Sequence, residues 1–67
     1  MNQRKRFTRI VIYIKDIVRI TGKKKTAARN LYYTIMKAFG KKPGQFLTKD
    51  EFAMYTGIEM NYIESFL

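Results

Sequence analysis

The spacing of apolar residues predicts two consecutive helices in the first part of the chain. From residue 15 onward the apolar positions recur with a helical period, and Gly22 ends this first helix. We expect a longer helix over residues 27–39, with Thr26 as its N-cap and Gly40 in the left-handed conformation that commonly closes a helix. One side of this helix is apolar and consists of Ala28, Leu31, Tyr32, Ile35, Met36 and Phe39.

The same pattern predicts a second pair of helices after a turn at residues 41–44. Thr48 and Glu51 have the spacing of a capping box, in which the hydroxyl and the carboxylate each accept a hydrogen bond from a backbone amide at the start of a helix. This third helix should end at Gly57. A final helix is expected over residues 59–67, with an apolar side formed by Tyr62, Ile63, Phe66 and Leu67.

Two short segments, near residues 12–14 and 45–47, suit extended structure because they hold β-branched or aromatic residues. The expected fold is therefore mainly α, a compact four-helix domain with two short β segments. Its parts are a basic arm at residues 1–6 and a single domain at residues 7–67, in which residues 15–39 form a helix-turn-helix and residues 48–67 form the second helix pair.

Two stretches of the sequence resemble each other. Residues 15–22 begin with Lys-Asp and end with Thr-Gly, and residues 49–57 do the same. Aligning the two Thr-Gly pairs matches Ile17 with Phe52, Val18 with Ala53 and Leu31 with Phe66. The Lys-Asp pairs are then one residue out of register, so an internal repeat and a chance resemblance both stay open.

The composition excludes several classes of protein. Hydrophobic residues make up 46% of the 67 residues, which is enough for one core and too little for two. The chain has no cysteine and no histidine, which excludes disulfides, zinc fingers and the commonest nucleophiles and bases. The acids Asp16, Asp50, Glu51, Glu59 and Glu64 are spaced like solvated or helix-capping residues. We therefore expect no enzyme, no metal and no cofactor.

The longest apolar run, residues 10–14, is too short to cross a membrane. We also expect no signal peptide, because no long apolar segment follows the basic start of the chain. These features favour a cytoplasmic protein that does not bind membranes.

Charge gives the strongest functional signal. Fourteen lysines and arginines face five acids, for a net charge of +9. Residues 1–49 hold all fourteen cations and a single acid, whereas residues 50–67 hold four acids and no cation. This asymmetry predicts one surface that attracts polyanions, although a basic surface that only keeps the protein soluble is the simpler alternative.

The expected helix at residues 27–39 has the side chains of a DNA-reading surface opposite its apolar side. Arginine can donate two hydrogen bonds to guanine and asparagine can pair with adenine in the major groove, so Arg29 and Asn30 are the principal candidates. The base-reading set is Thr26, Arg29, Asn30 and Tyr33. The expected phosphate contacts are Lys23, Lys24, Lys25, Lys37, Lys41 and Lys42, together with Arg4, Lys5 and Arg6 of the arm.

Most aromatic residues are expected in the core rather than in nucleic-acid contacts. This set comprises Phe39, Phe46, Phe52, Tyr55, Tyr62 and Phe66. Tyr33 is the exception, because it lies opposite the apolar side of its helix. If Tyr13 and Tyr33 were exposed neighbours, they would favour RNA binding, since unpaired bases stack on aromatic rings.

The residues at 14–17, 20–23 and 26–29, read as IKDI, ITGK and TAAR, are followed by AFGK at 38–41 and QFLT at 45–48. This pattern resembles small helix-turn-helix proteins of bacterial mobile elements and phages, such as excisionase-like and winged-helix regulators. The resemblance implies DNA binding by the helix after Thr26, with Arg29 at a recognition-helix position. The resemblance covers about residues 12–57. The chain departs from it in the acidic C-terminal half, which lacks the basic wing or second reading helix of such proteins.

We therefore expect a regulator or recombination accessory factor that binds double-stranded DNA, with sequence-specific or semi-specific contacts from residues 26–39. The second helix pair would support the first or form a homodimer through its acidic surface. The alternative is a phage-type small protein whose basic face inhibits a host protein that handles nucleic acids.

Overall fold

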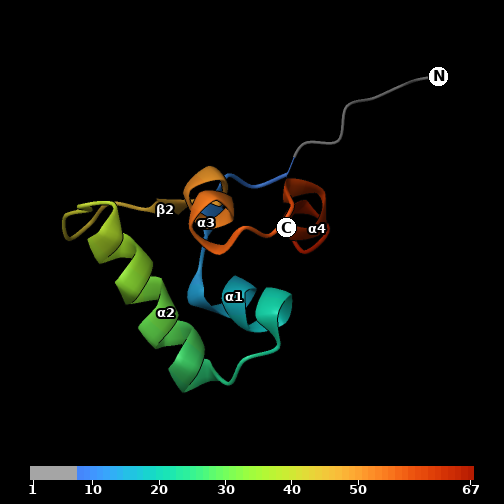
Figure 1. The fold of residues 1–67 in the computed structure, drawn as a ribbon, viewed down its shortest axis with the longest axis horizontal. Coiled ribbons are helices and arrows are strands. Elements are labelled where there is room, and N and C mark those ends of the chain that lie inside the picture. Colours follow the sequence, from blue (N-terminus) through green and yellow to red (C-terminus); the bar gives the residue numbers. More distant parts are fainter. Residues whose placement is uncertain (1–7) are drawn as a thin grey trace.

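Six elements follow one another in the computed structural model, which describes residues 8–67. They are β1 (Val11–Ile12), α1 (Ile14–Thr21), α2 (Lys25–Ala38), β2 (Leu47–Thr48), α3 (Lys49–Thr56) and α4 (Met60–Glu64). Figure 1 shows α2 along one side of the molecule and α4 on the other, with α1 and α3 between them. The fold is mainly α with a short two-stranded sheet, as the sequence predicts. The expected arm at residues 1–6 lies outside the described residues.

The two strands hold the halves of the chain together. β1 and β2 pair antiparallel, with Val11 opposite Thr48 and Ile12 opposite Leu47. The amide of Lys49 extends this pairing by donating to the carbonyl of Ile10 at 2.8 Å. Both predicted β segments exist. The first lies one to two residues earlier than expected, because α1 already begins at Ile14, and the second lies one to two residues later.

The core lies between the sheet and the helices. Its buried residues are Ile12, Ile17, Ile20, Ala28, Ile35, Leu47, Phe52 and Ile63. The predicted apolar side of α2 is confirmed, since Ala28 and Ile35 are fully buried. The other four members of that side, Leu31, Tyr32, Met36 and Phe39, are partly buried and pack against the core.

The N-cap predicted at Thr26 is wrong. Lys24 adopts an extended backbone directly after the Gly22 turn, and its carbonyl accepts the first helical hydrogen bond from the amide of Ala28 at 2.8 Å. Helix α2 therefore begins at Lys25, two residues before its expected start, and Thr26 lies inside its first turn. The other end fits the prediction, because Gly40 is left-handed with φ of 65° and the amide of Lys41 donates back to the carbonyl of Met36 at 2.9 Å.

The predicted capping box is confirmed at the start of α3. The amide of Glu51 donates to Thr48 Oγ1 at 3.1 Å, and the amide of Thr48 donates to Glu51 Oε1 at 3.0 Å. Helix α3 ends at Gly57, also as predicted. Helix α4 is shorter than the predicted 59–67, because the amides of Phe66 and Leu67 donate to carbonyls three residues back and form turns instead of α-helix.

The two Thr-Gly segments adopt the same conformation. Gly22 and Gly57 have φ of 75° and 78°, and each donates its amide to the carbonyl four residues earlier. Before each glycine, the threonine hydroxyl donates to a helical carbonyl, Thr21 to Ile17 at 2.6 Å and Thr56 to Phe52 at 2.8 Å. The similarity that the alignment suggested is therefore also a similarity of structure at these turns.

The prediction that six aromatic residues belong to the core is correct for Phe52, which is fully buried, and for Phe39 and Phe66, which are partly buried and pack against the core. It is wrong for the other three. Phe46 is 57% exposed, because it precedes the inward-facing Leu47 and successive side chains point to opposite faces of a strand. Tyr62 is exposed because it lies next to the buried Ile63 on a short helix, about 100° around the axis. Tyr55 is exposed as well, since α3 directs only Phe52 fully into the core.

None of the helices within residues 8–67 combines the length and the apolar composition that crossing a bilayer requires.

Candidate nucleic-acid interface

The four predicted base-reading residues share the exposed face of α2. Thr26, Arg29, Asn30 and Tyr33 are all exposed, and Ala28 and Ile35 are buried on the opposite face. The helix turns these four side chains outward because its apolar residues recur every three to four positions and pack on α1 and the core. The prediction that Tyr33 is exposed is confirmed, with 59% of its surface accessible.

Cations surround this face of α2. The turn between α1 and α2 exposes Lys23 and Lys24, and α2 begins with the exposed Lys25. The turn is held by the amide of Lys23, which donates to Thr21 Oγ1 at 3.1 Å. At the other end of the helix, Lys37 and Lys42 are also exposed. In the part of the chain that the structure describes, none of these five lysines makes an ion pair.

Lys41 differs from the other predicted phosphate contacts. Its ammonium lies 2.7 Å from Glu51 Oε2, and only 17% of its side chain is exposed. Burial alone would raise the pKa of Glu51, but the hydrogen bonds from Lys41 and Thr48 outweigh this effect and lower that pKa. Lys41 thus joins the end of α2 to the start of α3, and we omit it from the proposed phosphate contacts. Arg4, Lys5 and Arg6 lie outside the described residues.

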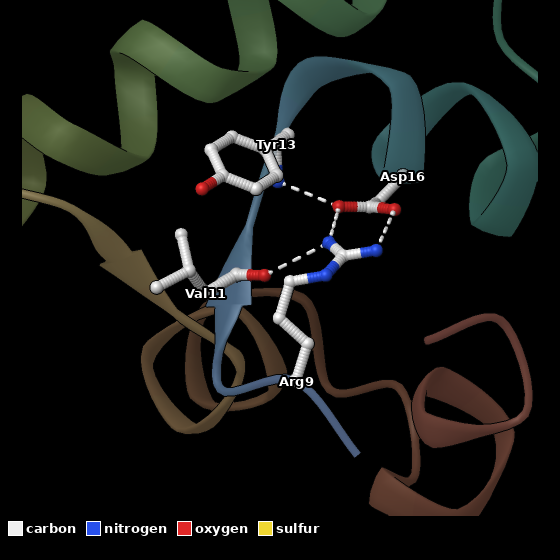
Figure 2. A network of polar contacts seen from close by, with 4 residues as sticks. All are labelled: Arg9, Val11, Tyr13 and Asp16. Carbon is white, nitrogen blue, oxygen red and sulfur yellow. Dashed lines mark hydrogen bonds and ion pairs between the residues drawn. The ribbon is translucent and has the colours of Figure 1, made fainter.

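The buried acid Asp16 corrects a further expectation. Its side chain is fully buried, although the sequence suggests a solvated or capping residue. As Figure 2 shows, Arg9 contacts both carboxylate oxygens of Asp16 and also donates to the carbonyl of Val11 at 3.1 Å. The capping part of the expectation is met, because the amide of Tyr13 donates to Asp16 Oδ2 at 2.8 Å. The hydrogen bond to Asp16 raises the pKa of Arg9.

The burial of Asp16 determines the charge of the surface. Between residues 10 and 49 it is the only acid. The same stretch exposes eight cations, namely Lys15, Arg19, Lys23, Lys24, Lys25, Arg29, Lys37 and Lys42. We call this surface of α1, the turn, α2 and the loop after α2 the basic face. Residues 10–49 contribute no exposed carboxylate to it, so this stretch has a strongly positive surface that attracts anionic ligands.

Two members of the basic face, Lys15 and Arg19, were missed by the sequence reasoning. Together with Lys25, Arg29 and two apolar residues of α1, they line a hollow between α1 and α2. The signal was present in the sequence, because cations four residues apart share one side of a helix.

A second hollow, near the C-terminal end of α2, collects aromatic residues. We call it the aromatic hollow, and its rings are Tyr13, Tyr32, Tyr33 and Phe46. Burial raises the pKa of Tyr32, and the adjacent Tyr33 and Tyr13 add to this shift. Tyr13 and Tyr33 are both exposed and line the same hollow, which is the arrangement that the sequence analysis associated with RNA binding.

Comparison with known proteins gave no relative: no protein-family model, no curated protein and no solved structure matches the chain.

Proposed function

We propose that the protein binds double-stranded DNA through the basic face, with α2 in the major groove. The observation that carries this proposal is the set of eight exposed cations on α1, the turn, α2 and the loop after α2, with the only acid among residues 10–49 buried against Arg9. Phosphate neutralisation supplies most of the affinity of such interfaces. A helix-turn-helix suits this task, because its second helix can enter the major groove while its first helix crosses the DNA backbone.

The roles on the basic face follow from side-chain chemistry. Arg29 and Asn30 are the base readers, because their side chains can form paired hydrogen bonds with guanine and adenine. Thr26 and Tyr33 lie one turn before and after them on the same face and reach neighbouring bases or phosphates. The lysines of the turn, with Lys15 and Arg19 of α1, would hold the phosphates on either side of the groove.

The second half of the chain supports this surface in the proposal. Lys49 Nζ lies 2.6 Å from Glu64 Oε2 and donates to Thr8 Oγ1 at 2.7 Å, which joins α3 to α4 and to the segment before β1. The hydrogen bond from Lys49 lowers the pKa of Glu64. The homodimer expected from the acidic second half stays a prediction, and sedimentation at several protein concentrations would measure it.

RNA binding is the second candidate function, favoured by the shared position of Tyr13 and Tyr33 in the aromatic hollow. Competition separates the two candidates. A labelled DNA duplex bound to the protein should be displaced by unlabelled DNA duplex at lower concentration than by an RNA hairpin of equal charge.

Selection of binding sites from a random duplex library tests the proposal directly. Enrichment of a common sequence would support base reading by α2. The number of phosphates neutralised follows from the salt dependence, because the logarithm of the binding constant falls with the logarithm of the salt concentration with a slope of roughly −0.9 per phosphate. Failure to retain any duplex at low salt would overturn the proposal.

A further inference from the structure

The aromatic hollow gathers rings that remain largely exposed to solvent. Three of its four rings belong to residues that stay 42–59% exposed, namely Tyr13, Phe46 and Tyr33. They come from three separate places in the chain, since Tyr13 precedes α1, Tyr33 lies in α2 and Phe46 precedes β2. Aromatic rings gathered on a surface without being buried are typical of binding sites, because their exposure is unfavourable in the free protein.

Contacts within the protein orient three of the four rings before any ligand binds. Tyr32 and Tyr33 meet edge to face, with centroids 5.2 Å apart and planes at 90°. The guanidinium of Arg9 lies 5.3 Å from the centroid of the Tyr13 ring, and its ion pair with Asp16 fixes it there. Rings that are already oriented lose little conformational freedom when a flat ligand stacks on them.

Charge beside the rings indicates the kind of ligand. A neighbouring hollow shares Tyr33, Met36 and Pro43 with the aromatic hollow and is lined by the exposed Lys37 and Lys42. None of the described residues that line either hollow is acidic. A flat apolar surface next to uncompensated cations matches a nucleotide, whose base stacks while its phosphate meets an ammonium group.

The position of Tyr33 on α2 places the aromatic hollow next to the basic face. Tyr33 lies four residues beyond Arg29, which corresponds to about 6 Å along the helix axis. That distance is about two base steps of a DNA strand at 3.4 Å each. We propose, on the basis of the duplex binding proposed above, that the aromatic hollow takes an unpaired base of a DNA strand where that strand leaves the duplex on the basic face.

The test uses the full chain and three labelled DNAs that share one duplex of 20 base pairs. The first is blunt, the second carries a five-nucleotide single-stranded extension, and the third carries the same extension without bases. The second and third have equal numbers of phosphates, so they differ only in the bases. We expect the extension with bases to bind at least about five-fold more tightly than the abasic one, as stacking of one base should give.

Variants locate this preference in the hollow. Tyr33→Ala and Phe46→Ala should remove it, whereas Tyr33→Phe should retain it, because the ring is what stacks. Tyr55→Ala is the matched control, since this tyrosine is similarly exposed but lies on α3 outside the hollow. The two alanine changes are at exposed positions, and circular dichroism checks that each variant is folded.

Each outcome has one meaning. Equal binding of the extensions with and without bases, while the blunt duplex still binds, would overturn this inference and leave the proposed function standing. Retention of the preference in Tyr33→Ala and Phe46→Ala would also overturn it. A tighter complex with the same extension made of RNA would overturn the assignment to DNA. Lack of binding to the blunt duplex at low salt would overturn the proposed function, and lack of binding to all three DNAs would overturn both.

Discussion

The guanidinium of Arg9 pairs with the fully buried carboxylate of Asp16, seven residues further along the chain. The same carboxylate accepts a hydrogen bond from the amide of Tyr13 and so fixes the start of α1. This pair therefore does two things at once: it fastens the segment before β1 to α1, and it removes from the surface the only acid among residues 10–49.

Truncation of Asp16 should destabilise the protein strongly. Asp16→Ala leaves Arg9 and the amide of Tyr13 without their acceptor. We expect the free energy of unfolding to fall by about 3 kcal/mol. This is the lower end of the range for a broken buried ion pair, because Arg9 is partly exposed. Asp16→Asn should cost less, since its amide oxygen can still accept from Tyr13. Urea unfolding followed by circular dichroism measures both.

Asp50→Ala is the matched control for this prediction. Asp50 also lies in the first turn of an eight-residue helix, but it is exposed. Its removal should cost about 0.5 kcal/mol, the usual contribution of an anion near a helix start. Equal losses in the two alanine variants would contradict the role given to burial and to Arg9.

Acid should weaken the fold through Glu51 and Glu64. The pKa of each is lowered in the folded protein, so below the unfolded value of about 4.3 the unfolded chain binds more protons than the folded one. Their stabilisation is therefore fully present above that pH and is lost as the pH falls through the folded pKa values. Urea unfolding at a series of pH values between 6 and 2, chosen as the window for these carboxyls, should show this decline.

The double variant Glu51→Gln, Glu64→Gln identifies the source of this decline. It removes both titrating groups while keeping side chains of similar shape, so stability should fall less steeply with acid than in the parent protein. An unchanged slope would show that other groups cause the acid sensitivity.

Local sequence signals predicted the elements of this fold well. The Thr48 and Glu51 capping box, the left-handed glycines and the apolar side of α2 all follow from interactions within a few residues, and the structure confirms them. The predicted start of α2 was wrong. The helix begins at Lys25, directly after the extended backbone of Lys24, whereas a side-chain cap at Thr26 would place its start two residues later.

Contacts between distant segments were beyond the sequence patterns. The burial of Asp16 depends on Arg9 reaching across from the segment before β1, and the aromatic hollow depends on the β1–β2 pairing and the loop that follows α2. No spacing rule links Tyr13 to Phe46, so the most informative site residues emerged only with the tertiary structure. The exposure of Arg29, Asn30 and Tyr33 was predictable, because amphipathic periodicity decides it.

Removal of one turn lysine should weaken binding to every duplex alike. Lys24 is exposed, makes no ion pair among the described residues and is expected to contact phosphate. For Lys24→Gln we expect a similar loss of affinity for all sequences. The salt dependence of binding should also become less steep, by roughly the contribution of one phosphate contact. Fluorescence anisotropy with several duplexes across a salt series measures both quantities.

Met54→Glu is the control for this effect of charge. It lowers the net charge by the same single unit, but on α3, where Met54 is 74% exposed and outside the basic face. Its salt slope should equal that of the parent protein. Equal weakening by both variants would mean that net charge alone, without a defined face, attracts the DNA.

Truncation of Arg29 should change sequence preference instead of general affinity. A guanidinium that donates two hydrogen bonds to guanine distinguishes that base from the other three, so Arg29→Ala should reduce discrimination at one base pair by about 1–3 kcal/mol. The measurement compares Kd values for the selected site and for its single-base-pair variants. Asn30→Ala should relax a different position, whereas Lys24→Gln should relax none. If Arg29→Ala weakened every site equally, Arg29 would be contacting phosphate, and its assignment as a base reader would be withdrawn.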